Sequence, residues 1–368
     1  MEKKFWKPSI TSQFIHCPIP YHMDTYRGCS FNCSYCFARD FVTFSRRNKG
    51  ENEKKFSYLV GNRADLLKSW ILRTLKKDYD YNKPEEVAFK ERIPIKIGAT
   101  SDPFPYAEDE EKITYDILKV FHEFDYPIEI QTKNPGGIAN IADDFINPNW
   151  AIAVTLISTD EKFIKVCEPS APSAKSRLEA IKKLTEKGFK VMIKIQPAIY
   201  PKIIEDLPEL IKGAKKAGCW AVNIEGLKVR ITMPEGERKL MNTIGDFLEY
   251  DIVDYYKLHG KKSGSDRELT LDLKSQFILE AGMLCDDYEI KFFVADNDFM
   301  GCGCNSECCG TEALRGYKIW GNNSRSDHFD GQANFSKELG KCYVNFVRSK
   351  KFEGKTMNEA VEEMKKGK

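Results

Sequence analysis

AIAVTLI at residues 151–157 is followed by AKSRLEAIKKLTEK at 174–187, VMIKI at 191–195, IEDLPELIKGAKKA at 204–217 and WAVNI at 220–224. The short runs are rich in isoleucine and valine, whereas the longer stretches have the length and composition of helices. Short apolar runs that alternate with helices of roughly 12–16 residues are typical of βα units and a parallel sheet. These residues therefore predict an α/β fold.

The same alternation continues in both directions along the sequence. Further strands are expected at Ile93–Ala99, Ile128–Thr132 and Ile290–Ala295. Further helices are expected at Ala64–Leu75, Glu110–Phe124, Glu237–Leu258 and Leu271–Leu284. Because crossovers between parallel strands are right-handed, we predict a full or partial barrel of the TIM type. Periodicity alone leaves an open doubly wound sheet as the alternative.

Composition places the chain among ordinary globular proteins. Hydrophobic residues make up 42% and charged residues 30% of 368 residues, which excludes a disordered chain. No stretch reaches the roughly 18–20 consecutive apolar residues of a membrane span. The start, Met1–Trp6, has no apolar run after its lysines, so we expect neither a signal peptide nor a membrane partner and place the protein in the cytoplasm.

The net charge of +2 gives no basic excess of the kind that a dedicated DNA-binding domain usually carries. A short basic cluster at Arg46, Arg47 and Lys49 permits contact with nucleic acid without favouring it. We expect three segments: an N-terminal extension at 1–25, the barrel at 26–296 and a cysteine-rich C-terminal extension at 297–368. Residues 1–28 are expected to form loops.

Polar side chains follow most of the expected strands at the point where each strand ends. They are Thr100-Ser101-Asp102, Thr132-Lys133, Ser158-Thr159, Gln196, Glu225 and Asp296-Asn297-Asp298. In a parallel barrel the active site forms at the carboxyl ends of the strands. Polar loops would explain any one of these residues, but their recurrence indicates a single site.

Three of the twelve cysteines form a first group, Cys29, Cys33 and Cys36, with the spacing Cys-x3-Cys-x2-Cys. Three thiolates on one short loop can hold three irons of a [4Fe–4S] cluster and leave the fourth iron open for a small molecule. Structural zinc usually takes four protein ligands, so a zinc site would need a fourth from His16, Cys17 or His22. Iron–sulfur is the favoured interpretation.

This spacing, with the aromatic Tyr35 just before the last cysteine and a βα series behind it, resembles the radical S-adenosylmethionine (SAM) superfamily. Four segments resemble its spore photoproduct lyase-like branch: Tyr26-Arg27-Gly28-Cys29, Thr100-Ser101-Asp102-Pro103, Gln131-Thr132-Lys133, and Glu168 to Ser173 leading to Arg177-Leu178-Glu179-Ala180. The resemblance implies a partial (β/α)6-type TIM barrel of the radical SAM kind. It also implies that the open iron binds SAM and that reductive cleavage releases a 5′-deoxyadenosyl radical. The electron would come from a reductant such as flavodoxin or ferredoxin.

The resemblance also implies roles for single residues. Ser101 and Asp102 would meet the amino group or ribose of SAM, and Ser158 would contact the ribose. Lys133 would face the SAM carboxylate or ribose, Tyr35 would lie near the adenine, and Gln196 is a further cofactor-binding candidate. Arg177 could pair with the SAM carboxylate. A surface ion pair is the alternative for Lys133 and Arg177.

One departure from the branch bears on the substrate. In spore photoproduct lyase a cysteine before the Thr-Ser-Asp segment returns a hydrogen to the product radical, and here that position is Ala99. Thymine-dimer repair by the same route is therefore not expected. Glu225, Asp296 and Asp298 are negative and would suit a substrate with a cationic amine. A small nucleoside-derived substrate of the queuosine type, cleaved to the queuine base, is the specific candidate for a lyase reaction.

Two other functions remain as alternatives. One is repair or modification of DNA or RNA, in which Arg46, Arg47 and Lys49 contact phosphates and a flipped base enters the barrel. The other is a non-catalytic iron–sulfur protein that binds partners or transfers electrons.

A second group of cysteines follows the last expected strand. Cys302, Cys304, Cys308 and Cys309 lie within eight residues, with glycines at 301, 303 and 310. An auxiliary iron–sulfur cluster could use three or four of them, with Cys285 or Cys342 as a further ligand, and is modestly favoured. A structural zinc is the alternative, although adjacent Cys308 and Cys309 are expected to share one zinc only with strain.

Overall fold

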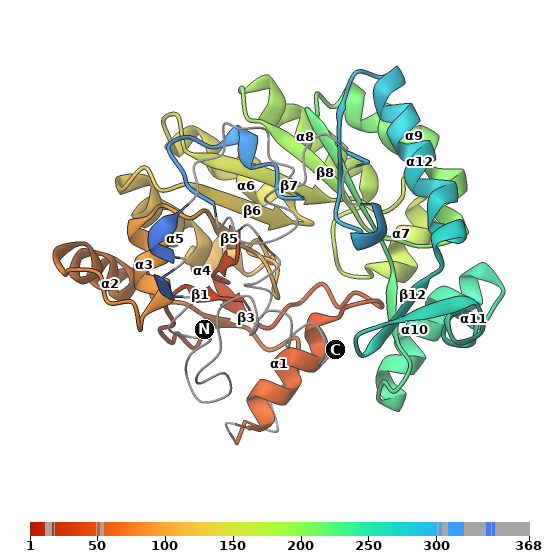
Figure 1. Cartoon of the computed structure of the whole chain (residues 1–368), viewed down its shortest axis with the longest axis horizontal. Helices are drawn as coiled ribbons and strands as arrows, with labels where there is room; N and C mark the ends of the chain where they lie inside the picture. Colours follow the sequence, from red (N-terminus) through yellow and green to blue (C-terminus); the bar gives the residue numbers. More distant parts are fainter. Residues whose placement is uncertain are drawn as a thin grey trace.

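The computed structural model describes residues 1–11, 17, 19–48, 50–51, 55–299, 302–303, 308–319, 336–339 and 341–342. A mostly parallel sheet forms its centre, in the order β1-β2-β5-β6-β7-β8-β9-β13. Helices pack around this sheet (Figure 1). The fold is the predicted α/β partial barrel, because β1 and β13 stand at opposite edges of an open sheet.

All six predicted strands are present, close to their predicted bounds. The strands of the central sheet are β1 (Ser9–Ile10), β2 (Tyr21–His22), β5 (Ile95–Ile97), β6 (Ile128–Thr132), β7 (Trp150–Thr155), β8 (Val191–Ala198), β9 (Ala221–Gly226) and β13 (Lys291–Val294). Neighbours from β2 to β13 are parallel, and only β1 runs antiparallel to its neighbour. The expectation that residues 1–28 form only loops was wrong, because β1, β2 and Tyr26–Arg27 (β3) lie there.

The two faces of the sheet bury different side chains. On the helix-facing side, Ile152, Ile193 and Val222 belong to the main hydrophobic core. On the inner side, Ala153, Met192, Ala221 and Phe293 form a separate small cluster. This alternation follows from the period of two along a strand and gives the barrel a filled interior.

All six predicted helices match single helices or adjacent pairs of helices. The helices are α1 (Ala38–Arg47), α2 (Ala64–Lys76), α3 (Pro84–Lys90), α4 (Glu108–Glu111), α5 (Ile113–Glu123), α6 (Pro135–Ile141), α7 (Glu161–Cys167), α8 (Ala174–Glu186), α9 (Lys202–Lys216), α10 (Glu235–Leu248), α11 (Ile252–His259) and α12 (Leu271–Asp287). The helix predicted at Glu110–Phe124 is interrupted at Lys112, and the helix predicted at Glu237–Leu258 is interrupted at Glu249. Both residues have positive φ (55° and 61°), a conformation that ends a helix.

Two small sheets accompany the barrel. β3 pairs antiparallel with β4 (Val60–Gly61), so the two strands that flank α1 in the sequence lie side by side. β10 (Lys228–Arg230), β12 (Asp266–Leu269) and β11 (Gly260–Ser263) form a three-stranded antiparallel sheet after β9. Short 3₁₀ turns occur at Ala142–Asp144, Asn297–Phe299 and Thr311–Ala313.

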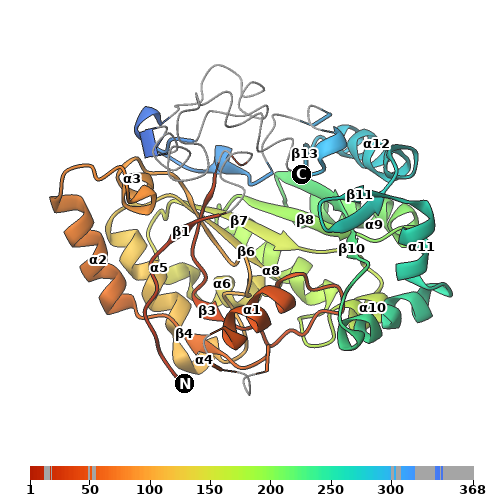
Figure 2. The ribbon, with the colours of Figure 1, turned by 60° about the horizontal axis from the view of Figure 1, so that its bottom comes forward.

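Residues 308–319 lie across the amino ends of the barrel strands. Arg92, just before β5, donates from Nε to the Gly316 carbonyl (2.6 Å), and Asn149, just before β7, exchanges hydrogen bonds with the backbone of Arg315 (3.0 and 2.8 Å). Lys291 at the start of β13 pairs with Glu312. Figure 2 shows the described C-terminal pieces on the side of the molecule opposite α1.

The predicted segment boundaries at residues 25 and 296 stay predictions. Only parts of the predicted extension at 297–368 belong to the described residues, and those parts pack on the barrel. Within the described ranges, no helix combines the length and apolar composition that a bilayer span requires.

Candidate functional site

The loop that carries the first three cysteines connects β3 to α1, at the carboxyl ends of the barrel strands. Gly28 starts this loop with φ of +89°, and a Cβ there would lie 2.2 Å from the Tyr58 carbonyl oxygen and 2.7 Å from that of Phe56. No residue with a side chain fits this position. The Cys29 amide then donates to the Phe56 carbonyl (3.1 Å), which fixes where the first thiol begins.

The middle of the loop is held by the carboxyl end of α7. The Ser34 amide donates to the Cys167 carbonyl and its hydroxyl donates to the Val166 carbonyl, both at 2.8 Å. Arg39 reaches back from α1 to the Asn32 side chain (2.9 Å) and the Cys33 carbonyl (3.1 Å). The loop is therefore supported from two helices.

Arg46 also supports this loop, which corrects its predicted role as a phosphate contact. Its side chain is buried, and its guanidinium donates to the carbonyls of Arg27 (3.3 Å), Tyr58 (2.5 Å) and Lys55. Backbone oxygens thus occupy the donors that a phosphate would need. Arg47 is exposed, and Lys49 lies outside the described residues.

Cys33 is buried, whereas Cys29 and Cys36 are half-buried. Burial, and then the Asp102 carboxylate, raise the pKa of Cys29 to about 11. Burial also raises the pKa of Cys33, while Lys133 opposes that rise and Cys36 and Cys29 add to it. Because their pKa values are raised, the Cys29 and Cys33 thiols stay protonated at neutral pH unless a bound metal deprotonates them.

The donor set of this loop fits an iron–sulfur cluster. Among the described residues, no three Cys, His, Asp or Glu side chains lie close enough together to hold one ion. A cube differs from a single ion, because each thiolate binds a different iron. Ser30 Oγ, between the first two cysteines, is buried with no hydrogen-bond partner among the described residues. Such an atom fits a loop that closes around a further group.

Asp102 joins the ends of β5 and β6. Its carboxylate accepts hydrogen bonds from the Phe104 amide (2.9 Å), the Thr132 hydroxyl (2.7 Å) and the Lys133 amide (2.7 Å). Burial raises the pKa of Asp102, although the bonds from Lys133 and Thr132 oppose the rise. Three protein donors already hold this carboxylate, so it also positions Lys133.

Lys133 lies next to the cysteine loop. Its ammonium is 5.6 Å from the centre of the Tyr35 ring and 3.9 Å from Glu168 Oε1, and its side chain is 18% exposed. Burial alone would lower the pKa of Lys133, but Cys33 and Glu168 raise it above its ordinary value. Lys133 is therefore a positive charge held at the edge of the cysteine loop.

Glu168 is the residue through which this part of the site is connected. It is fully buried, forms an ion pair with the fully buried Arg177, and accepts a hydrogen bond from the Tyr35 hydroxyl. Arg177 further donates to the carbonyls of Pro172 and Thr155, each at 2.9 Å. The ion pair considered for Arg177 exists, but it is internal rather than on the surface.

The two predicted serines lie at the same edge of the sheet. Ser101 is buried and donates from Oγ to the Tyr26 carbonyl. Ser158 is fully buried, and its Oγ accepts from the Asp160 amide (2.9 Å). Their predicted contacts with SAM stay predictions.

The predicted substrate carboxylates already have cationic partners. Glu225 accepts from Gln196 (3.3 Å) and Lys228 (2.6 Å). Asp296 and Asp298 share Lys274, at 2.7 and 2.5 Å, and Asp298 also pairs with Lys261. Although burial alone would raise it, Lys261 and Lys274 hold the pKa of Asp298 below its ordinary value. A cationic substrate would have to compete with these lysines.

A cavity of about 60 Å³ opens beside the cysteine loop. Tyr35 and Cys36 line one side, and Asp40, Arg230 and Glu237 line the other. Burial and the neighbouring Asp40 carboxylate raise the pKa of Glu237 to about 7. This cavity therefore combines the Arg230 cation with two neighbouring carboxyl groups, of which Glu237 has a pKa of about 7.

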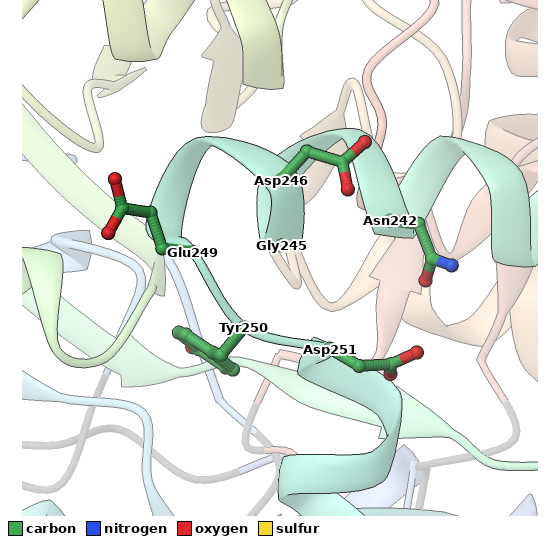
Figure 3. A pocket seen from close by; sticks show the side chains of 6 residues that line it. All are labelled: Asn242, Gly245, Asp246, Glu249, Tyr250 and Asp251. Carbon is green, nitrogen blue, oxygen red and sulfur yellow. The ribbon is translucent and has the colours of Figure 1, made fainter.

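A second hollow lies at the turn between α10 and α11, away from the cysteines. Asp246, Glu249 and Asp251 belong to its lining, and Glu249 points away from the other two (Figure 3). The three carboxylates do not converge on a common point, so they are not placed to share a metal ion.

The second cysteine group lies at the other end of the barrel from the first. Cys309 and Cys17 belong to one small buried cluster, with Cys308 packed against it. Cys302 is exposed, and Cys304 lies outside the described residues. Of the fourth zinc ligands considered for the first group, Cys17 is thus near the second group. His22 lies on β2 beside Ser9 (3.3 Å), and His16 lies outside the described residues.

Sequence reasoning missed two residues of the first site. Cys167 is fully buried at the end of α7, where its carbonyl holds Ser34, and Glu168 connects Tyr35, Lys133 and Arg177. Glu168 was noted only as part of a motif. The sequence offers one signal for this pair: Glu168 and Arg177 stand on either side of a turn that contains Pro169 and Pro172.

Comparison with known proteins gives relatives of low identity. No family model matches the sequence. Uncharacterized protein Rv2578c of Mycobacterium tuberculosis and uncharacterized protein Mb2609c of Mycobacterium bovis are each 24% identical over 219 residues, which is 58% of this chain. The alignment spans 60% of the length of these relatives, less than two thirds.

Solved structures share the fold. A spore photoproduct lyase mutant with dinucleoside spore photoproduct is 14% identical, with a TM-score of 0.53 over 75% of this chain and 76% of that chain. A second mutant, with bound AdoMet and dinucleoside spore photoproduct, is 15% identical, with a TM-score of 0.51 over the same shares. The chain therefore has the fold of spore photoproduct lyase.

Proposed function

We propose that this chain is a radical SAM enzyme of the spore photoproduct lyase-like branch. The observation that carries the proposal is the placement of the Cys29, Cys33 and Cys36 loop at the carboxyl ends of the strands, with Lys133 at its edge. The shared fold with a lyase that binds AdoMet supports it.

Cys29, Cys33 and Cys36 would hold a [4Fe–4S] cluster. When bound, the cluster supplies an open iron for SAM and the electron for its reductive cleavage. Lys133 is the residue of this chain best placed to meet the SAM carboxylate, because its ammonium is at the loop and partly exposed. Ser101, Ser158 and Gln196 complete the proposed SAM contacts.

The chain's own residues position these groups. Glu168 orients Tyr35 through its hydroxyl and attracts the Lys133 ammonium. Arg177 neutralises Glu168, so in our proposal it acts on the SAM site through Glu168. Asp102 holds the Lys133 backbone at 2.7 Å. These buried contacts exclude water from one side of the cysteine loop.

For the substrate, we propose a small nucleoside-derived molecule, with conversion of a queuosine-type nucleotide to its queuine base as the specific candidate. The polar lining of the cavity beside Cys36 supports a polar ligand, which would compete with the ion pair between Asp40 and Arg230. Ala99 lies where the branch has its hydrogen-donating cysteine, and this argues against direct repair of thymine dimers.

Repair or modification of nucleic acid is the second candidate, because the solved structures of the same fold contain a dinucleoside. The buried Arg46 weakens it, since one of the three basic residues expected at the phosphates is occupied by carbonyls.

The test is anaerobic incubation of the reconstituted protein with SAM and a reductant, with measurement of 5′-deoxyadenosine. We expect cleavage by the wild type and none by Cys33→Ala, which loses a cluster ligand. Cys219→Ala is the matched control, because Cys219 is equally buried but lies at the start of β9. Equal cleavage by Cys33→Ala and the wild type would contradict the proposal, and so would no cleavage by a wild type that holds its iron.

Two substrate arms follow. Release of a free base from a queuosine-type nucleotide, insensitive to salt, would support the small-molecule substrate. Turnover only of DNA or RNA, with an affinity that falls steeply with salt, would instead support the second candidate. Iron that binds without any SAM cleavage would indicate a non-catalytic iron–sulfur protein.

A further inference from the structure

Cys308 and Cys309 of the second cysteine group lie next to Cys17 at the amino end of the barrel. Cys17 and Cys309 share a buried apolar cluster with Ile19 and Ile319, and Cys308 packs against it. The two segments are far apart in the sequence, so the fold and not a local turn brings their thiols together. Gly310, with φ of +68°, turns the chain immediately after Cys309.

The spacing of two of these sulfurs matches a tetrahedral metal site. Cys308 Sγ and Cys309 Sγ are 3.7 Å apart. Zinc–sulfur bonds of roughly 2.3 Å in a tetrahedron place neighbouring sulfurs about 3.8 Å apart. In a cube each thiolate binds its own iron, which separates the sulfurs further. The adjacency of the two cysteines is therefore no obstacle to a shared zinc ion.

The charges around these thiols require an additional anion. Lys96 Nζ donates to Cys17 Sγ (3.4 Å), and Lys194 is buried 3.5 Å from the fully buried Glu129. Two ammonium groups and one carboxylate leave an excess of one positive charge in the barrel interior, and buried charge without compensation is costly. Three thiolates around a divalent ion carry one negative charge, which balances this excess.

We propose that Cys17, Cys308 and Cys309 supply three of the four ligands of a structural zinc ion that closes the amino end of the barrel. Cys308 and Cys309 provide one edge of the site, and Cys17 provides the third thiolate. In the described residues no three such groups yet surround a common point, and Cys17 Sγ contacts the Ile19 carbonyl oxygen at 3.2 Å. Zinc binding would require the deprotonated Cys17 side chain to turn from Ile19 toward the pair.

The test is zinc content after challenge with a chelator, measured by mass spectrometry of the digested protein. The wild type should retain about one zinc per chain, whereas Cys17→Ser should retain less than about a fifth of that amount. Cys219→Ser is the matched control, because it removes a buried thiol elsewhere in the fold and should retain full zinc. Equal zinc in Cys17→Ser and Cys219→Ser would overturn the role of Cys17.

A second measurement separates this site from the first and covers a Cys17 variant that fails to fold. Cys33→Ala should lose iron and acid-labile sulfide but retain zinc, and cobalt substituted into it should show the visible absorption of tetrahedral thiolate coordination. Cys308→Ser in that background should abolish the absorption. Iron and sulfide that persist in Cys33→Ala at the expense of zinc would overturn the zinc assignment and indicate a second cluster. This outcome does not depend on whether the protein cleaves SAM.

Discussion

Replacing Arg177 by methionine tests the buried ion pair that underlies the candidate site. Arg177 and Glu168 are both fully buried, and the substitution leaves the Glu168 carboxylate with Lys133, 3.9 Å away, as its nearest cation. Breaking a buried pair from one side typically costs about 3–5 kcal/mol. The carbonyls of Pro172 and Thr155 also lose their donors, at roughly 1 kcal/mol each or more.

Partial compensation by Lys133 reduces this sum, so we expect Arg177→Met to lower the free energy of unfolding by about 4 kcal/mol. The double variant Arg177→Met/Glu168→Gln should recover about 2 kcal/mol, because it removes the isolated charge. Urea unfolding followed by far-ultraviolet circular dichroism measures both values.

An exposed ion pair on the same helix provides the control. Lys182 and Glu186 lie 3.8 Å apart on α8, and each is 63% exposed. Lys182→Met should change the free energy of unfolding by no more than about 0.5 kcal/mol. If the free energies of unfolding of Arg177→Met and Lys182→Met differ by less than about 1 kcal/mol, the buried Glu168–Arg177 pair stabilises the protein no more than an exposed pair does.

Three further predictions concern the loop, the cavity and the SAM site. Gly28→Ala should severely lower the iron content of the reconstituted protein, because the added Cβ would collide with backbone oxygens. Gly50 also has positive φ but has no atom within 4 Å of an added Cβ. Gly50→Ala should therefore lower the free energy of unfolding by only about 1 kcal/mol and leave the iron content unchanged. Glu237 binds its proton more tightly in the folded protein, so folding stability falls as pH rises from about 4.5 to about 7. After allowance for solvent screening, Glu237→Gln should therefore raise the free energy of unfolding by about 1 kcal/mol at pH 8 and change it little at pH 4, as measured by urea unfolding. An equal rise in the exposed control Glu235→Gln would contradict this prediction. Lys133→Ala should weaken SAM binding about tenfold or more in equilibrium dialysis at unchanged iron content, and unchanged affinity would remove Lys133 from the SAM site.

The parallel sheet was predictable from sequence because its strands are buried on both faces. Runs such as Ala151–Ile157 and Val191–Ile195 are apolar enough to identify without knowledge of their partners. Tyr21–His22 was not predictable, since its two residues form a strand only through pairing with β1 on one side and with Lys96 of β5 on the other. The helix breaks at Lys112 and Glu249 were also hidden, because neither residue type favours positive φ.

For the candidate site, local spacing was predictable and long-range pairing was not. The cysteine spacing at Cys29, Cys33 and Cys36 lies within one loop and can be recognised directly. The connection of Tyr35 and Lys133 through Glu168 depends on three elements that meet only in the folded chain. The position of Cys17 beside Cys309 likewise depends on contacts between the two ends of the chain.

The strap at residues 308–319 has a consequence for how the protein is made. It contacts the starts of β5, β7 and β13, yet a ribosome adds it after all of those strands. Since translation proceeds at roughly 5–20 residues per second, about 10–40 seconds pass between synthesis of β5 and synthesis of residues 308–319, and the amino ends of the strands stay uncovered during that time. A chain that ends prematurely near residue 300 would therefore contain all strands of the central sheet but would leave their amino ends uncovered. We expect chaperones and proteases to recognise such a chain.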